Sequence, residues 1–61
     1  MDLFIIENNG LNTYSYRKET AKTREEAKSI IMYHLAFNNK YVCFTYTEVD
    51  AKTMIENLTG N

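Results

Sequence analysis

The run from Thr23 to Asn38 constrains the fold of this chain more than any other stretch, because it is the longest segment with helical periodicity. Thr23 and Glu26 form a capping box, in which the hydroxyl accepts from the Glu26 amide and the carboxylate reaches back to the Thr23 amide. One side of the helix collects an apolar stripe, and the opposite side is mostly polar. The stripe comprises Ala27, Ile31, His34, Leu35 and Asn38, widened by Ile30, Tyr33 and Phe37. This pattern predicts an amphipathic helix lying on a sheet.

Two segments before the helix and one after it are predicted to be β-strands. Residues 2–8 are rich in β-formers, and Asn9-Gly10 behind them is a strong hairpin signal, since a type I′ turn needs positive φ at both positions. Residues 11–18 then alternate, and residues 40–47 are aromatic and β-branched. With Asn9-Gly10 as the loop, each residue of the second strand has a defined partner. One sheet face then presents Leu3, Ile5, Tyr14 and Tyr16, and the other presents Phe4, Ile6 and Leu11.

A short helix is expected to end the chain, with Asp50 as its cap and Gly60 as its stop. The predicted fold is a single α+β domain over residues 1–61, with the element order β-β-α-β-α. The first strand has the most continuous apolar core, so it is placed in the middle of a three-stranded antiparallel sheet of order 2-1-3. The main helix covers one face only, which leaves a second apolar face and two open edges.

A chain of 61 residues buries only about 60% of its unfolded surface, so its core is small and a second source of stability is expected. The single cysteine, Cys43, excludes an internal disulfide, and one histidine with one cysteine cannot fill a zinc site. No metal or cofactor is therefore expected. The remaining source of added stability is a homodimer, with Met32 and Ala36 on the far side of the helix as its contact.

The net charge of −1 gives the whole chain no marked electrostatic preference. No apolar run approaches the roughly 20 residues of a membrane span. No basic and then apolar secretory signal is present. A lone thiol fits a reducing compartment, so a cytoplasmic location is expected.

The single cysteine and the single histidine offer one candidate catalytic pair, a Cys43 thiolate activated by His34. The sequence positions no orienting third group and no oxyanion hole for such a pair. It also contains no Gly-rich phosphate loop and no hydrolase motif. The favoured interpretation of His34 is a partly buried histidine of the helix, and the chain is predicted not to be an enzyme.

Tyrosines and carboxylates form the candidate partner-binding set. Tyrosine is enriched in protein interfaces because it offers a large contact area at little entropy cost. An aromatic sheet face would equally suit base stacking, although the third strand lacks the glycine and the aromatic spacing of the RNA-recognition signature. The acidic residues near the C-terminus offer a second contact surface. The predicted partner-binding residues are Tyr14, Tyr16, Tyr41, Tyr46, Glu48, Asp50 and Glu56.

A basic segment between residues 17 and 28 supports an alternative, a small dimeric regulator that binds nucleic acid. Its five cations are diluted by three glutamates to a net charge of +2, whereas a nucleic-acid-binding domain normally has a clearer basic excess. A solvated face with intrahelical charge pairs is the favoured interpretation. The nucleic-acid candidates are Arg17, Lys18, Lys22, Arg24 and Lys28.

The hairpin around Asn9-Gly10, followed by Thr20-Ala21-Lys22-Thr23-Arg24-Glu25-Glu26-Ala27-Lys28, resembles small accessory proteins of bacteriophages. In these proteins a β-hairpin leads into a helix that opens with a Thr/Ser-x-Glu-Glu-Ala type start. The resemblance covers roughly the first half of the chain. It implies a phage protein that binds and blocks a host protein, including CRISPR and other defence enzymes. The small size, the missing catalytic residues and the second apolar face predict a non-enzymatic protein-binding module, and the resemblance implies that it is of the phage inhibitor type.

Overall fold

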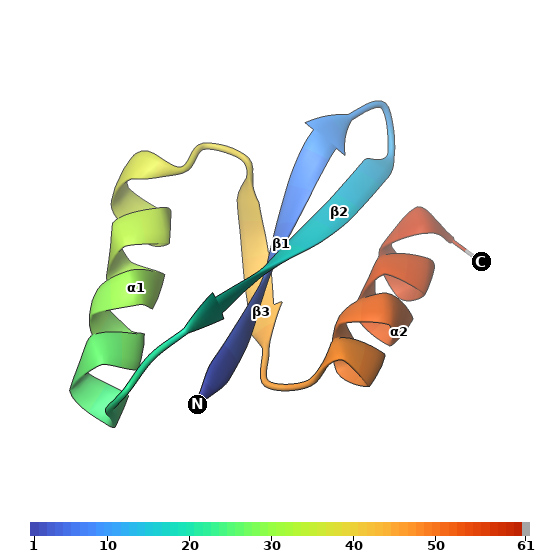
Figure 1. Cartoon of the computed structure of the whole chain (residues 1–61). Coiled ribbons are helices and arrows are strands. Elements are labelled where there is room, and N and C mark those ends of the chain that lie inside the picture. Colours follow the sequence, from blue (N-terminus) through green and yellow to red (C-terminus); the bar gives the residue numbers. More distant parts are fainter. Residues whose placement is uncertain (61) are drawn as a thin grey trace.

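The computed structural model describes residues 1–60, so Asn61, the last residue of the expected single domain, lies outside the described part. The elements are β1 (Asp2–Gly10), β2 (Thr13–Thr20), α1 (Arg24–Phe37), β3 (Tyr41–Thr45) and α2 (Glu48–Thr59). The strands form one antiparallel sheet of order β2-β1-β3 (Figure 1). The predicted α+β class, element order and strand order are confirmed.

Helix ends follow the predicted chemistry with two differences. The Thr23 hydroxyl accepts from the Glu26 amide at 3.1 Å, but the Glu26 carboxylate accepts from the Lys22 amide rather than from Thr23. The cap of α2 is Thr47 and not Asp50, because the Thr47 hydroxyl accepts from the Asp50 amide at 3.1 Å. Gly60 ends α2 in the left-handed conformation, as expected.

The hairpin turn lies two residues later than predicted. Leu11 and Asn12 have the positive φ angles of a type I′ turn, 51° and 62°. Gly10 has a φ of 96° and lies at a bulge in β1, where the Asn8 side chain accepts from its amide at 2.7 Å. The Asn9-Gly10 loop was therefore wrong, because the positive φ of Gly10 serves the bulge and not the turn.

The later turn and the bulge together shift the register of β2 by three residues. Leu3 pairs with Glu19 instead of Tyr16. Side chains alternate between the faces of a sheet, so an odd shift moves the whole side-chain pattern to the opposite face. Tyr14 and Tyr16 accordingly lie with Phe4 on the face opposite Leu3, which corrects the predicted pairing of faces.

Both faces of the sheet are covered, because α1 and α2 pack on opposite sides of it (Figure 1). Under α1 the core comprises Leu3, Ile5, Ala21 and Ala27, with Ile30, Ile31, Tyr41 and Phe44 against it. Under α2 it comprises Phe4, Ile6 and Ala51, with Tyr14, Tyr16, Cys43, Met54, Ile55 and Leu58 against it. The expectation of an open second face was wrong, since the C-terminal helix closes it.

The outer part of the predicted α1 stripe is exposed. Ala27 and His34 are buried, whereas Leu35 and Phe37 are 66% and 77% exposed. Three strands span only about 10 Å between their outer axes, which is close to the diameter of one helix. A sheet of this width covers the centre of the stripe and leaves both of its flanks in solvent.

Candidate functional site

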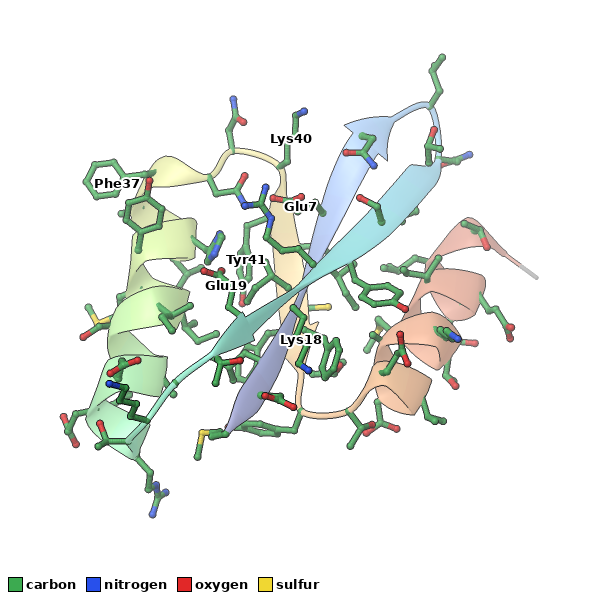
Figure 2. The ribbon with its side chains drawn as sticks, in the orientation of Figure 1. Glu7, Lys18, Glu19, Phe37, Lys40 and Tyr41 are labelled. Atoms are coloured by element: carbon green, nitrogen blue, oxygen red, sulfur yellow. The ribbon has the colours of Figure 1, made fainter. Side chains whose placement is uncertain are left out.

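Large apolar side chains gather in solvent on the C-terminal half of α1. Met32, Tyr33, Leu35 and Phe37 are all exposed, and Ala36 lies among them. The rings of Tyr33 and Phe37 lie one helical turn apart, with centroids 5.4 Å apart. Figure 2 shows Phe37 projecting from the end of α1, away from the sheet. We call these five residues the α1 apolar surface.

A groove separates α1 from β3. It encloses about 250 Å³ and has an apolar floor with two cations beside it. No residue of β2 lines it, so it lies on the β3 side of α1. Its lining residues are Met1, Leu3, Arg24, Ala27, Lys28, Ile31, Met32, Phe44 and Tyr46. We call it the α1–β3 groove, and it adjoins the α1 apolar surface through Met32.

The two edge strands of the sheet differ in charge. β2 has three consecutive charged residues, Arg17, Lys18 and Glu19, which discourage pairing with another strand. β3 has the sequence Tyr-Val-Cys-Phe-Thr and no charge at all. The edge that adjoins the groove is therefore the unprotected one, although β3 is only five residues long.

A buried polar cluster fixes the opposite flank of α1 to the sheet. His34 Nε2 contacts the Glu19 carboxylate of β2, and Asn38 Nδ2 donates to Glu7 of β1 at 2.7 Å. Arg17 adds an ion pair to Glu7 at 3.3 Å. Figure 2 shows Glu7 and Glu19 lying in the space between α1 and the sheet.

The hydrogen bonds of Asn38 assign the tautomer of His34. The side-chain oxygen of Asn38 accepts from the Lys40 amide at 3.0 Å, so its Nδ2 faces the ring. Nδ2 is a donor, and His34 Nδ1 accepts from it at 2.9 Å. Nε2, on the other side of the ring, contacts the Glu19 carboxylate. Both ring nitrogens are engaged inside the protein, which is the arrangement of a structural histidine.

The structure does not bring the predicted tyrosines together on one surface. Tyr14 and Tyr16 are half-buried beneath α2, whereas Tyr41 is half-buried on the α1 side, stacked on His34. Tyr46 is exposed at the α1–β3 groove. Of the predicted tyrosines, Tyr46 alone offers most of its ring to a partner.

The predicted acidic residues all lie exposed on α2. The Tyr16 hydroxyl donates to Glu48 at 2.5 Å and so ties β2 to the start of α2. This hydrogen bond, together with burial and the nearby negative charge, raises the pKa of Tyr16. Asp50 and Glu56 form no ion pair within residues 1–60.

The basic residues of the nucleic-acid alternative are divided between different surfaces. Arg17 pairs with Glu7 on the α1 side of the sheet, and Lys18 pairs with Asp2 at 3.6 Å on the other side. Lys22 lies in the connection before α1. Arg24 and Lys28 line the α1–β3 groove together.

Met32 and Ala36, the predicted dimer contact, are both exposed on α1. They belong to the α1 apolar surface, which extends further than the sequence predicted. Self-association through them stays a prediction.

Cys43 and His34 do not form a dyad, because they lie on opposite sides of the sheet. Cys43 packs in the core beneath α2, and His34 lies beneath α1. Burial raises the pKa of the Cys43 thiol. A nucleophilic cysteine needs the opposite shift, toward the thiolate at neutral pH.

We expect a thiol reagent to modify Cys43 more slowly at pH 7 than it modifies a free cysteine. The raised pKa lowers the thiolate fraction, and the surrounding core restricts access. The measurement is the rate of reaction with a chromogenic disulfide from pH 7 to pH 9, with the urea-unfolded chain as the control. A folded chain that reacts as fast as the unfolded one at pH 7 would show that Cys43 is neither buried nor suppressed.

Within residues 1–60, no three side chains of His, Cys, Asp or Glu gather closely enough to hold a metal ion. Neither α1 nor α2 combines the length and the apolar character that a membrane-spanning helix needs. In comparisons with protein-family models, curated proteins and solved structures, the chain matched none.

Proposed function

We propose that this chain is a non-enzymatic protein-binding module that acts in the cytoplasm by occupying a partner's surface, as a phage-type inhibitor of a host protein does. The observation behind the proposal is the α1 apolar surface. Nine large apolar side chains are exposed among residues 1–60, and four of them lie on α1. Apolar patches of this kind mark protein interaction sites on small soluble domains.

The energetics favour a partner on α1 rather than on the tyrosine-bearing face of the sheet. Burying one large apolar side chain contributes about 1.5–3 kcal/mol, so Leu35 and Phe37 together are enough to anchor an interface. Tyr14 and Tyr16 already contribute their area to the domain's own core beneath α2. The proposal therefore assigns partner contact to α1 and not to the tyrosines of β2.

The two residues best suited to catalysis, His34 and Cys43, are both held in structural positions, which favours a binding role over an enzymatic one. Both nitrogens of His34 are engaged within the protein, and Cys43 lies on the other side of the sheet with a raised pKa. The phage-type assignment rests on the resemblance of residues 20–28 to the helix starts of phage accessory proteins. A host protein is the partner that this resemblance implies.

Leu35→Glu is expected to abolish partner capture, because it inserts a charge into the proposed interface. Loss of one hot-spot side chain costs about 2 kcal/mol or more, which is about 30-fold in affinity. The experiment is affinity capture from bacterial lysates with the wild-type protein and the variant. Val49→Glu is the matched control, since Val49 is 72% exposed but lies on α2.

Circular dichroism of both variants first establishes that they fold. Proteins retained by the wild type and by Val49→Glu but lost with Leu35→Glu would support the proposal. Retention of the same proteins by Leu35→Glu would move the contact away from α1. A wild-type protein that captures nothing above the bare matrix would overturn the binding role itself.

A further inference from the structure

We propose that the α1–β3 groove binds an acidic, extended segment of the partner protein. One large apolar side chain of the segment fills the groove, its carboxylates pair with Arg24 and Lys28, and its backbone adds to the free edge of β3. The inference rests on the proposed function and specifies the chemistry of the partner.

The groove has the size and lining of a site for side chains. Its volume of about 250 Å³ is smaller than the pockets of drug-sized ligands, which are about 300–1,000 Å³. Leu3 and Ala27 are buried in its floor, and Phe44 and Ile31 pack against them. An apolar side chain that enters from outside would extend this core.

Two cations beside the groove have no counterion within residues 1–60. Arg24 and Lys28 lie one helical turn apart on α1, where like charges repel each other mildly. None of the ion pairs of residues 1–60 includes either side chain. Arg17 and Lys18, in contrast, are paired with Glu7 and Asp2. The charge at the groove is therefore complementary to carboxylates supplied by a partner.

The neighbouring edge of the sheet favours an extended segment over a helix. β3 is an edge strand without charged residues, so its outer side is open to strand addition. Side chains of an added strand alternate between the two sheet faces. Those on the α1 side would lie beside Phe44, within reach of the groove and of Lys28. A segment that alternates apolar and acidic residues would fill the groove, pair with its cations and add to the β3 edge at the same time.

The test is a display selection of random 16-residue peptides on the immobilised protein, followed by fluorescence anisotropy of the enriched peptides. We expect enrichment of peptides that combine a large apolar residue with at least two carboxylates. Arg24→Glu/Lys28→Glu should weaken their binding about tenfold or more. Lys22→Glu/Lys52→Glu is the matched control, because it gives the same net charge through two exposed cations outside the groove.

The binding site of an enriched peptide is located from the changes that it causes in the amide chemical shifts of the full chain, measured in ¹H–¹⁵N spectra. Changes centred on Ala27, Phe44 and Tyr46 would support the inference. Enriched peptides without carboxylates, or peptides that bind both double variants equally, would overturn it and leave the proposed function standing. Concentration-dependent dimerisation that Arg24→Glu/Lys28→Glu abolishes would also overturn it, because the occupant would then be a second copy of this chain. The proposed function has a different test: it is overturned if lysate capture yields no partner, whatever the peptide experiment shows.

Discussion

Replacing Ile5 with alanine is expected to lower the free energy of unfolding by about 2–5 kcal/mol, the usual effect of truncating a buried isoleucine. Ile5 is fully buried in the central strand, in contact with the core beneath α1. A domain of 61 residues has a total stability of only about 3–9 kcal/mol. The variant should therefore be largely or partly unfolded at 37 °C.

Urea unfolding followed by circular dichroism measures this loss. Val42→Ala is the control, because Val42 lies on edge strand β3 and is 38% exposed. We expect the control to change the stability by less than about 1 kcal/mol. A similar loss in both variants would mean that the core is not concentrated on β1.

Local chemistry made the fold predictable from the sequence. The capping residue Thr23, the apolar run in β1 and the aromatic and β-branched residues of β3 each act within a few neighbouring residues. Strand order followed from one further step, since the most apolar strand has to be the most covered. These inferences need no knowledge of the rest of the molecule.

The register of the hairpin depends on a choice between neighbouring residues with similar preferences. Gly10 and Asn12 both tolerate positive φ, and the sequence favoured the Asn9-Gly10 pair because both of its residues suit a type I′ turn. In the observed hairpin the Asn8 side chain accepts from the Gly10 amide at the bulge. The resulting shift of three residues places Tyr14 and Tyr16 on the other face of the sheet.

The candidate site could be predicted only in part, for a similar reason. The isolated pair Met32 and Ala36 indicated an exposed apolar surface on α1. Leu35 and Phe37 were assigned to the covered stripe, because periodicity gives the angle of a residue on the helix but not the width of the sheet beneath it. An apolar stripe of eight residues on a helix above three strands is a signal that some of it stays in solvent.

His34→Ala is expected to lower the free energy of unfolding by about 3 kcal/mol, the second largest loss that we predict. The ring is buried, stacks on Tyr41, and has one nitrogen on Glu19 and the other on Asn38. Truncation leaves a cavity and removes both polar contacts. Chemical denaturation at pH 7 measures the loss.

His34→Phe separates the two contributions, since it retains an aromatic ring and removes only the nitrogens. We expect this variant to lose about 1–2 kcal/mol, because the Glu19 carboxylate is partly exposed and reaches water. Equal losses in His34→Ala and His34→Phe would assign the whole effect to the hydrogen bonds. No loss in His34→Phe would show that the polar cluster adds nothing to stability.

Leu35, the residue after His34, provides the matched control and connects the predicted loss of stability with partner binding. Leu35→Ala should change stability by less than about 0.5 kcal/mol, because Leu35 is mostly exposed, yet it should weaken partner capture. His34→Ala should affect both properties, since His34 and Asn38 fix the flank of α1 against β1 and β2. If a stabilising osmolyte restores capture by His34→Ala but not by Leu35→Glu, then His34 positions the surface and Leu35 forms it. If the osmolyte does not restore capture by His34→Ala, then the loss of capture in that variant does not come from lost stability.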